Sequence, residues 1–405
     1  MISTRNTLNK LAQALAALIV FVAGVECALR VAGIGFPPRT QPDAVLGVLH
    51  RPGATFWQHE EGDSYVQINS EGFRDIEWPV EKHAGEFRIA VLGDSYVESM
   101  QVPIEQRFTE LLAEDLTHEK PFAGQTVRVM NFGMAGYGTG QELLLLRDRV
   151  AKYHPDLVVL GFLTANDLSD NCRALRDHNQ RPFFVLNNGE LRLDDSFARS
   201  SSWKDRIVRA IADDSRIVQI AYEARRTLRS LRGRNASAPD AKQNSVPEWG
   251  LDDLIYLPPA TPSWHEAWEI TEQLLLAVNE EALAMGATLL VVTLTNPDQM
   301  HPDPAARAAY MNHVGAKYLS YPDDRVERFC EEHGIAVEKL VPAMLAYAQA
   351  NHVFLHGFEN TKMGRGHWNQ AGHRLVAELI AKKITAMRTQ ATQREETQQS
   401  ARDGL

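Results

Sequence analysis

Short hydrophobic runs alternate with helical patterns along the middle of the chain. The runs at 87–93, 126–133 and 156–163 predict strands, because they are short, aliphatic and bounded by turn residues. Strands are also predicted at 287–295 and 335–341. Helical spacing occupies the segments between and after them, at 105–118, 140–153, 271–286, 323–334 and 371–387. The alternation predicts an α/β fold of three layers, with a mostly parallel five-stranded sheet and right-handed helical crossovers.

This regularity breaks at about 168–262, where we expect a helical insertion. Residues 201–234 have helical periodicity and many arginines. They predict solvated lid or surface helices, and contact with an anionic bilayer or a polysaccharide is the alternative. A polar linker at 235–247 follows them.

The stretch 11–35 is apolar and is interrupted only by Gln13, Glu26 and Arg30. As a helix it could cross a bilayer, with Glu26 and Arg30 near the far interface. A cleaved signal peptide is the alternative, although Glu26 stands where cleavage is expected. A buried core helix is a third possibility. Under either of the first two hypotheses, the rest of the chain is exported.

These patterns divide the chain into four parts. Residues 1–35 form an anchor or signal segment, and 36–86 a connecting segment with short strands. The α/β domain occupies 87–388 and contains the insertion, and 389–405 form a disordered tail.

Composition narrows the function classes. The chain has 405 residues with 44% hydrophobic and 23% charged residues, which is typical of a globular protein. Its net charge of −10 argues against a nucleic-acid-binding surface. The three cysteines lack metal-site spacing and are expected to be unpaired.

Polar residues that could carry chemistry stand where the predicted strands end. Ser95 follows the first core strand, a glycine-rich loop follows the second, and Asn166 with Asp167 follows the third. His367 precedes the last helix. Loops at the carboxyl ends of parallel strands converge, so these groups could form one site. Each motif alone has a plain structural interpretation, such as helix capping by Asp94 and Ser95.

In this order the motifs resemble those of the SGNH, or GDSL-type, hydrolases. The resemblance rests on Gly93-Asp94-Ser95, a glycine after the second strand, Asn166-Asp167, and a late His-x-Asn-x-x-Gly-His beginning at His367. It covers roughly 87–387 apart from the insertion. It implies that Ser95 is the nucleophile and His367 the base, and that Ser95, Gly136 and Asn166 form the oxyanion hole. No metal or cofactor is implied.

One departure from the family concerns the acid that usually precedes the histidine by two or three residues. Gly364 and Arg365 occupy those positions here. A backbone carbonyl or Glu359 could orient His367 instead. Because an orienting acid affects the rate by orders of magnitude, a non-catalytic site is also possible.

Other residues near these motifs have mainly structural interpretations. We expect His373 to cap or pack rather than to join His356 and His367 in a zinc site. The tryptophans Trp57, Trp264 and Trp268 are expected in the core or under the lid. Trp368, beside His367, could line the substrate pocket.

The function predicted is an exported or membrane-tethered serine esterase that hydrolyses O-acyl esters, such as O-acetyl esters, of a glycan or lipid. Two alternatives remain: an exopolysaccharide O-acetyltransferase, since the arrangement is similar to tethered acetylation proteins of alginate-like systems, and a non-catalytic glycan-binding protein. The expected location is a single-pass N-terminal anchor with the domain on the extracytoplasmic side, or secretion after cleavage.

Overall fold

The computed structural model describes residues 2–403 except 123, 177–180, 201–202 and 236–252. Its centre is a parallel five-stranded sheet in the order β11-β10-β7-β5-β6. The predicted α/β fold is confirmed, and each predicted core strand is present. The strands are β5 (Glu86–Gly93), β6 (Thr126–Gly133), β7 (Leu157–Leu163), β10 (Thr288–Leu294) and β11 (Ala336–Lys339).

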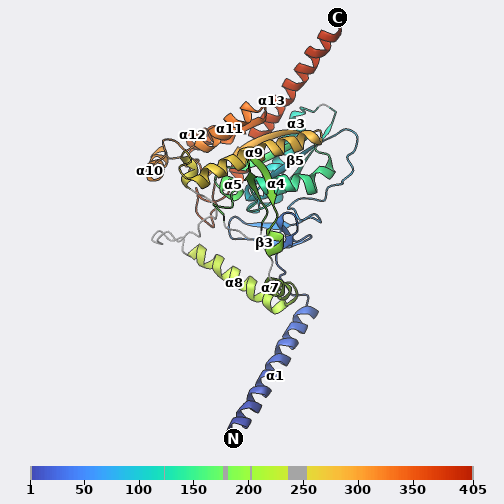
Figure 1. Cartoon of the computed structure of the whole chain (residues 1–405), viewed down its shortest axis with the longest axis vertical. Coiled ribbons are helices and arrows are strands. Elements are labelled where there is room, and N and C mark those ends of the chain that lie inside the picture. The colour runs from blue at the N-terminus through green and yellow to red at the C-terminus, as the bar shows by residue number, and fades with distance from the viewer. Residues whose placement is uncertain (1, 123, 177–180, 201–202, 236–252, 404–405) are drawn as a thin grey trace.

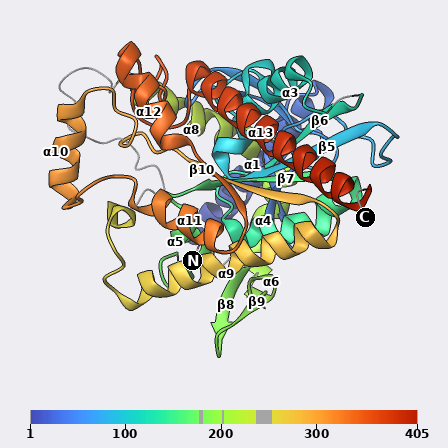
Figure 2. The ribbon, with the colours of Figure 1, turned by 90° about the horizontal axis from the view of Figure 1, so that it is seen from above.

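Helices cover both faces of this sheet, as Figure 2 shows. Helices α3 (Phe108–Glu119), α12 (Leu340–Asn351) and α13 (Gln370–Asp403) lie on one face, and α4 (Thr139–Leu145), α9 (Pro262–Ala284) and α11 (Tyr321–Glu332) on the other. The middle strand β7 is buried along its whole length, as its uninterrupted apolar run predicts. The three-layer arrangement therefore follows from burying both sheet faces.

Short elements connect the layers. Helix α4 continues as a π-helical turn and a 3-10 turn, so the predicted helix at 140–153 is present but irregular. The short elements are α2 (Ser95–Glu98), η1 (Ile104–Gln106), η2 (Leu146–Val150), η3 (Ala151–Tyr153), α5 (Asp167–Asn171), η4 (Asp253–Tyr256) and α10 (Pro304–Val314).

The connecting segment before the sheet forms two antiparallel hairpins. The first pairs β1 (Thr40–Asp43) with β2 (Gly47–His50). The second pairs β3 (Thr55–Gln58) with β4 (Ser64–Gln67). Residues 59–63 form the turn between β3 and β4, which we call the acid turn.

The insertion is not wholly helical, and the expectation of a helical insertion is corrected here. It begins with a hairpin of β8 (Phe183–Asn187) and β9 (Glu190–Asp194), whose two-residue turn Asn188-Gly189 has positive φ at both residues. Asn-Gly is the sequence that such a turn prefers. Helices α6 (Phe197–Ser200), α7 (Trp203–Asp214) and α8 (Arg216–Asn235) follow, and all of the predicted linker after Asn235 lies outside the described residues.

Both chain ends project from the body of the protein (Figure 1). Helix α1 (Ile2–Val31) contains a 23-residue span, Asn9–Val31, that is long and apolar enough to cross a membrane and is not buried by the protein. Its end is fixed to the junction of α7 and α8, where Glu26 accepts hydrogen bonds from the backbone N–H of Arg216 (2.9 Å) and Ile217 (3.1 Å). Helix α13 continues to Asp403, through the region expected to be disordered.

Candidate active site

Ser95 is the first residue of α2, directly after β5. The carboxylate of Asp94 caps this helix by accepting a hydrogen bond from the Tyr96 backbone N–H at 2.9 Å. The turn needs glycine at two neighbouring places. A Cβ on Gly93 would lie 2.3 Å from a Val97 methyl, and one on Gly133 would lie 2.2 Å from the Glu98 backbone nitrogen. These glycines allow α2 to pack tightly, so that the Ser95 side chain is held at the end of the strand.

The Ser95 hydroxyl meets the His367 ring, although the two residues are 272 positions apart. Ser95 Oγ lies 2.8 Å from His367 Nε2. His367 belongs to the loop 352–369, which precedes α13 and which we call the histidine loop. The structure thus brings together the two residues that the sequence predicts as nucleophile and base.

A carboxylate from the acid turn completes the arrangement. Glu61 Oε2 lies 2.6 Å from His367 Nδ1, and Glu61 Oε1 accepts a hydrogen bond of 2.7 Å from the His367 backbone N–H. The expectation that a backbone carbonyl or Glu359 orients the ring is wrong, since Glu61 occupies that position and Glu359 is exposed. Gly366 must be glycine here, because a Cβ would lie 2.0 Å from Glu61 Oε1.

The Glu61 carboxylate is held in its charged form. Burial acts to raise its pKa, but the nearby His367 ring and the two hydrogen bonds outweigh burial and hold the pKa below its ordinary value. An ionised acid at Nδ1 fixes the proton on that nitrogen and leaves Nε2 free to accept a proton from Ser95.

Asn360 joins the acid turn to the histidine loop. Its side-chain oxygen accepts a hydrogen bond from the Gly62 N–H at 3.1 Å. Its amide nitrogen donates to the carbonyls of His59 (3.2 Å) and Gly62 (2.7 Å). The Tyr96 hydroxyl also donates to the Gly366 carbonyl at 3.0 Å. These contacts set where Glu61 stands relative to His367.

The two remaining predicted residues lie in the loops that follow β6 and β7. Asn166 donates one amide hydrogen bond of 3.1 Å to Asp94 Oδ2, which leaves its second N–H available. Gly136 follows β6 and has φ of +76°, and its carbonyl accepts a hydrogen bond from Arg181. Gly133 packs closely against the backbone of α2, so its glycine is explained by packing alone. This favours Gly136 as the glycine of the predicted oxyanion hole.

Three carboxyl groups are fully buried near Ser95. Burial raises the pKa of Asp94 to about 6, against its hydrogen bonds. Burial also raises the pKa values of Glu142 and Asp167 well above their ordinary range, and neighbouring carboxyl groups add to the effect. Neither Glu142 carboxyl oxygen has a hydrogen-bond partner among the described residues. These acids are therefore uncharged over part of the pH range in which exposed acids ionise.

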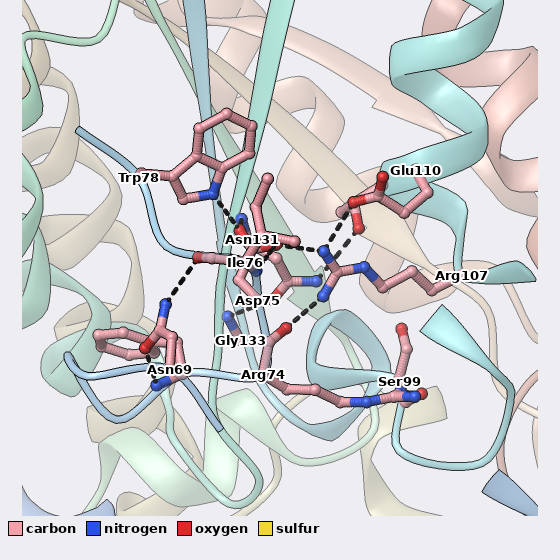
Figure 3. A network of polar contacts seen from close by, with 12 residues as sticks. Asn69, Arg74, Asp75, Ile76, Trp78, Ser99, Arg107, Glu110, Asn131 and Gly133 are labelled. Atoms are coloured by element: carbon pink, nitrogen blue, oxygen red, sulfur yellow. Dashed lines mark hydrogen bonds and ion pairs between the residues drawn. The ribbon is translucent and has the colours of Figure 1, made fainter. Parts of the chain in front are cut away.

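A buried polar network packs against α2 (Figure 3). Asp75 accepts hydrogen bonds from Trp78 Nε1 at 2.6 Å and from the Asn131 backbone N–H at 2.8 Å, and it pairs with Arg107. Asn131 in turn donates to the Val97 carbonyl at 2.7 Å. The connecting segment is thus tied to both α2 and β6.

The structural interpretations of nearby residues have mixed outcomes. His373 is buried and stacks on Phe108, and burial lowers its pKa to about 3, in keeping with a packing role. Trp368 is fully buried and donates to Thr295, so it does not line an open pocket. Trp264 and Trp268 are buried, whereas Trp57 is 54% exposed, so the expectation of burial is wrong for Trp57. Within the described ranges, no cluster of three His, Cys, Asp or Glu side chains could hold a metal.

Comparisons with known proteins find ester hydrolases. No family model matches the chain. A curated arylesterase of Vibrio mimicus is 38% identical over 80 residues, which is 20% of this chain and 38% of that protein.

Similar solved structures include two acetylxylan esterases and a GDSL-like lipase. The acetyl xylan esterase AlAXEase is 13% identical, with a TM-score of 0.38, 74% of this chain covered and 100% of that one. An acetylxylan esterase of Geobacillus stearothermophilus, studied as a catalytic mutant, is 11% identical with a TM-score of 0.37, and the match covers 75% of this chain and 96% of that one. The GDSL-like lipase of Bacteroides thetaiotaomicron is 12% identical with a TM-score of 0.32, and the match covers 74% of this chain and 88% of that one. With TM-scores this low, the chemistry must be judged from the site itself, whose motifs resemble the SGNH hydrolases.

Proposed function

We propose that the protein is a serine ester hydrolase of the SGNH type. The observation that carries the proposal is the continuous chain of contacts from Ser95 Oγ through the His367 ring to the Glu61 carboxylate. Ser95 is the nucleophile, His367 the general base and Glu61 the orienting acid. The N–H groups of Ser95 and Gly136 and the second amide N–H of Asn166 form the oxyanion hole.

The reaction proceeds in two halves. Ser95 Oγ attacks the ester carbonyl carbon while His367 Nε2 takes the hydroxyl proton, and the oxyanion hole stabilises the negative charge on the carbonyl oxygen. The carbon–oxygen bond to the alcohol breaks as His367 protonates the leaving oxygen. Water, deprotonated by His367, then attacks the acyl-serine, and the proton returns to Ser95 as the acid is released.

The substrate class proposed is O-acyl esters, above all O-acetyl esters, of a glycan or lipid. The acetylxylan esterases among the similar structures are named for acetyl esters of a glycan, whereas the arylesterase is named for esters of aryl alcohols. The exposed apolar helix α1 supports a membrane tether, with the domain on the extracytoplasmic side. Secretion after cleavage of this segment is the alternative.

Glu61 weakens the case for a non-catalytic protein, because that hypothesis rested on the missing acid. An O-acetyltransferase would use the same groups, with a sugar hydroxyl in place of water. Assays that include an oligosaccharide acceptor distinguish the two, since a transferase accumulates acetylated oligosaccharide at the expense of free acetate.

The test is hydrolysis of p-nitrophenyl acetate by the full-length chain and by Ser95→Ala. We expect turnover that the substitution abolishes, with the folded state retained by circular dichroism. The proposal would be refuted if Ser95→Ala still turned over the substrate, or if the folded wild-type protein did not turn it over.

A further inference from the structure

The β3–β4 hairpin, which carries the acid turn, has one buried and one open face. On the buried face, Val66 packs with Ile68 and Met100. On the open face, Trp57 and Tyr65 are directly paired across the strands and are 54% and 46% exposed. Alternation along the strands explains this division, but it does not explain two large aromatic side chains on the solvent face.

The open face forms an aromatic platform. The Trp57 ring lies 5.4 Å from the Tyr65 ring and stacks on the His59 ring at 5.5 Å with an interplanar angle of 4°. Flat rings with polar edges suit ligands that have both apolar and hydroxyl-bearing faces. Adjacent exposed aromatic residues commonly mark a binding surface.

The platform lines a groove of about 1580 Å³ between the hairpins and α8. Tyr222 of α8, which is 72% exposed, lines the groove as well. Charged groups also line it: Arg39, and Glu60 paired with Arg226 at 3.2 Å. The volume exceeds the roughly 300–1,000 Å³ typical of a small-molecule site, so the groove suits an extended ligand.

The exposed aromatic rings and the charged side chains favour a sugar chain over an acyl chain, although phenylalanine, proline and alanine side chains also line the groove. Sugar rings stack on aromatic faces through their C–H groups and offer hydroxyls to charged side chains. An acyl chain offers no partner to the polar and charged groups that line the groove, and their desolvation would weaken its binding.

The acid turn links the groove to the candidate active site along the chain. His59 and Glu60 line it, and the next residue, Glu61, contacts His367. Trp57 is four residues before Glu61 and, because residues 59–63 form a turn, lies within roughly 13 Å of it, the span of four fully extended residues. We infer that the groove is a glycan subsite, in which Trp57 and Tyr65 hold an O-acylated polysaccharide chain while one of its ester groups reaches Ser95. This inference rests on the proposed esterase function.

The experiment compares two kinds of substrate on the full-length chain. The variants Trp57→Ala and Tyr65→Ala are assayed on p-nitrophenyl acetate and on soluble acetylated xylan, acetylated alginate and acetylated cello-oligosaccharides. Trp203→Ala is the matched control, since this tryptophan is 62% exposed on α7 and does not line the groove. We expect KM for at least one glycan to rise about tenfold in the groove variants, with kcat/KM for p-nitrophenyl acetate unchanged and the control normal.

Three outcomes would overturn the subsite while leaving the esterase intact. They are turnover of p-nitrophenyl acetate but of no glycan, glycan kinetics unchanged in both groove variants, and a rise in KM for phospholipid vesicles, assayed in parallel, rather than for glycans. Absence of turnover on every substrate would instead refute the proposed function. The two failures are therefore distinguishable.

Discussion

Glu61 is the residue that completes the chain of contacts from Ser95 through His367. It binds His367 through both carboxylate oxygens, one to the ring and one to the backbone. The motifs identify Ser95, Asn166 and His367 because those residues stand in a fixed order at strand ends. Glu61 lies outside that order, upstream of Ser95 in a hairpin turn, and nothing in its local sequence separates it from Glu60.

Glu61→Gln tests the role of this acid. An amide cannot stabilise the imidazolium and can favour the wrong ring tautomer, so kcat for p-nitrophenyl acetate should fall by about 10²- to 10⁴-fold with little change in KM. Glu359→Gln is the control, because this exposed acid lies in the histidine loop and was the alternative from sequence. Equal activity of Glu61→Gln and wild type would contradict the assignment.

Glu142 is expected to make stability depend on pH. Its pKa is raised by burial, so its uncharged form favours the folded state at low pH, and this contribution is lost as pH rises through the folded-state pKa. Burial of Asp94 adds the same loss of stability as the pH rises from about 4 to about 6.

Glu142→Gln should therefore stabilise the protein at pH 8 by about 1–3 kcal/mol and flatten the fall in Tm between pH 5 and pH 8. Thermal unfolding at several pH values measures this, with the exposed Glu114→Gln as control. If the Tm of Glu142→Gln at pH 8 were lower than that of the wild-type protein, the folded protein would stabilise the Glu142 carboxylate, which would contradict this prediction.

At the scale of elements, the regular parts of the fold could be predicted and the irregular parts could not. The core strands have continuous apolar runs because both of their faces are buried. The β8–β9 hairpin carried a readable signal in Asn188-Gly189, but the arginine-rich helical pattern around it dominated the interpretation. The contact between the acid turn and the histidine loop joins residues about 300 positions apart, which no local pattern encodes.

Asn360 is the residue that makes this long-range contact. Asn360→Ala removes three hydrogen bonds to the acid turn, so Glu61 should be less well placed and kcat should fall by about 10- to 100-fold with KM nearly constant. Asn351→Ala is the matched control, since this asparagine is exposed at the end of α12.

A role confined to stability would give a different result. In that case Tm would fall while kcat, measured well below the unfolding temperature, stayed normal. Combining Asn360→Ala with Glu61→Gln should add little further loss, because both changes act on the same contact.

At the scale of the whole molecule, α1 connects the α/β domain to a bilayer in our proposal. Its exposed apolar span was predicted from hydropathy, but its attachment to the α7–α8 junction through Glu26 was not. Contact between a helix end and an insertion about 190 positions away depends on the tertiary structure, which hydropathy does not contain.

Charges placed in the middle of α1 test the tether. Val20→Arg with Phe21→Arg should release the protein from membranes, since each central arginine costs about 2.5–3.5 kcal/mol on insertion scales. Val208→Arg, on the exposed surface of α7, is the control. Fractionation followed by alkaline carbonate extraction measures the release, and a soluble wild-type protein whose sequence begins after residue 35 would instead indicate a cleaved signal.

Labelling with a fluorophosphonate probe, followed by peptide mass spectrometry, tests the central claim most directly. We expect the probe to modify Ser95 alone, and the labelling rate to fall by about 10²-fold or more in Glu61→Gln but not in Glu359→Gln. Absence of the adduct on Ser95, or labelling of Ser95 at the wild-type rate without Glu61, would contradict the account of an activated serine.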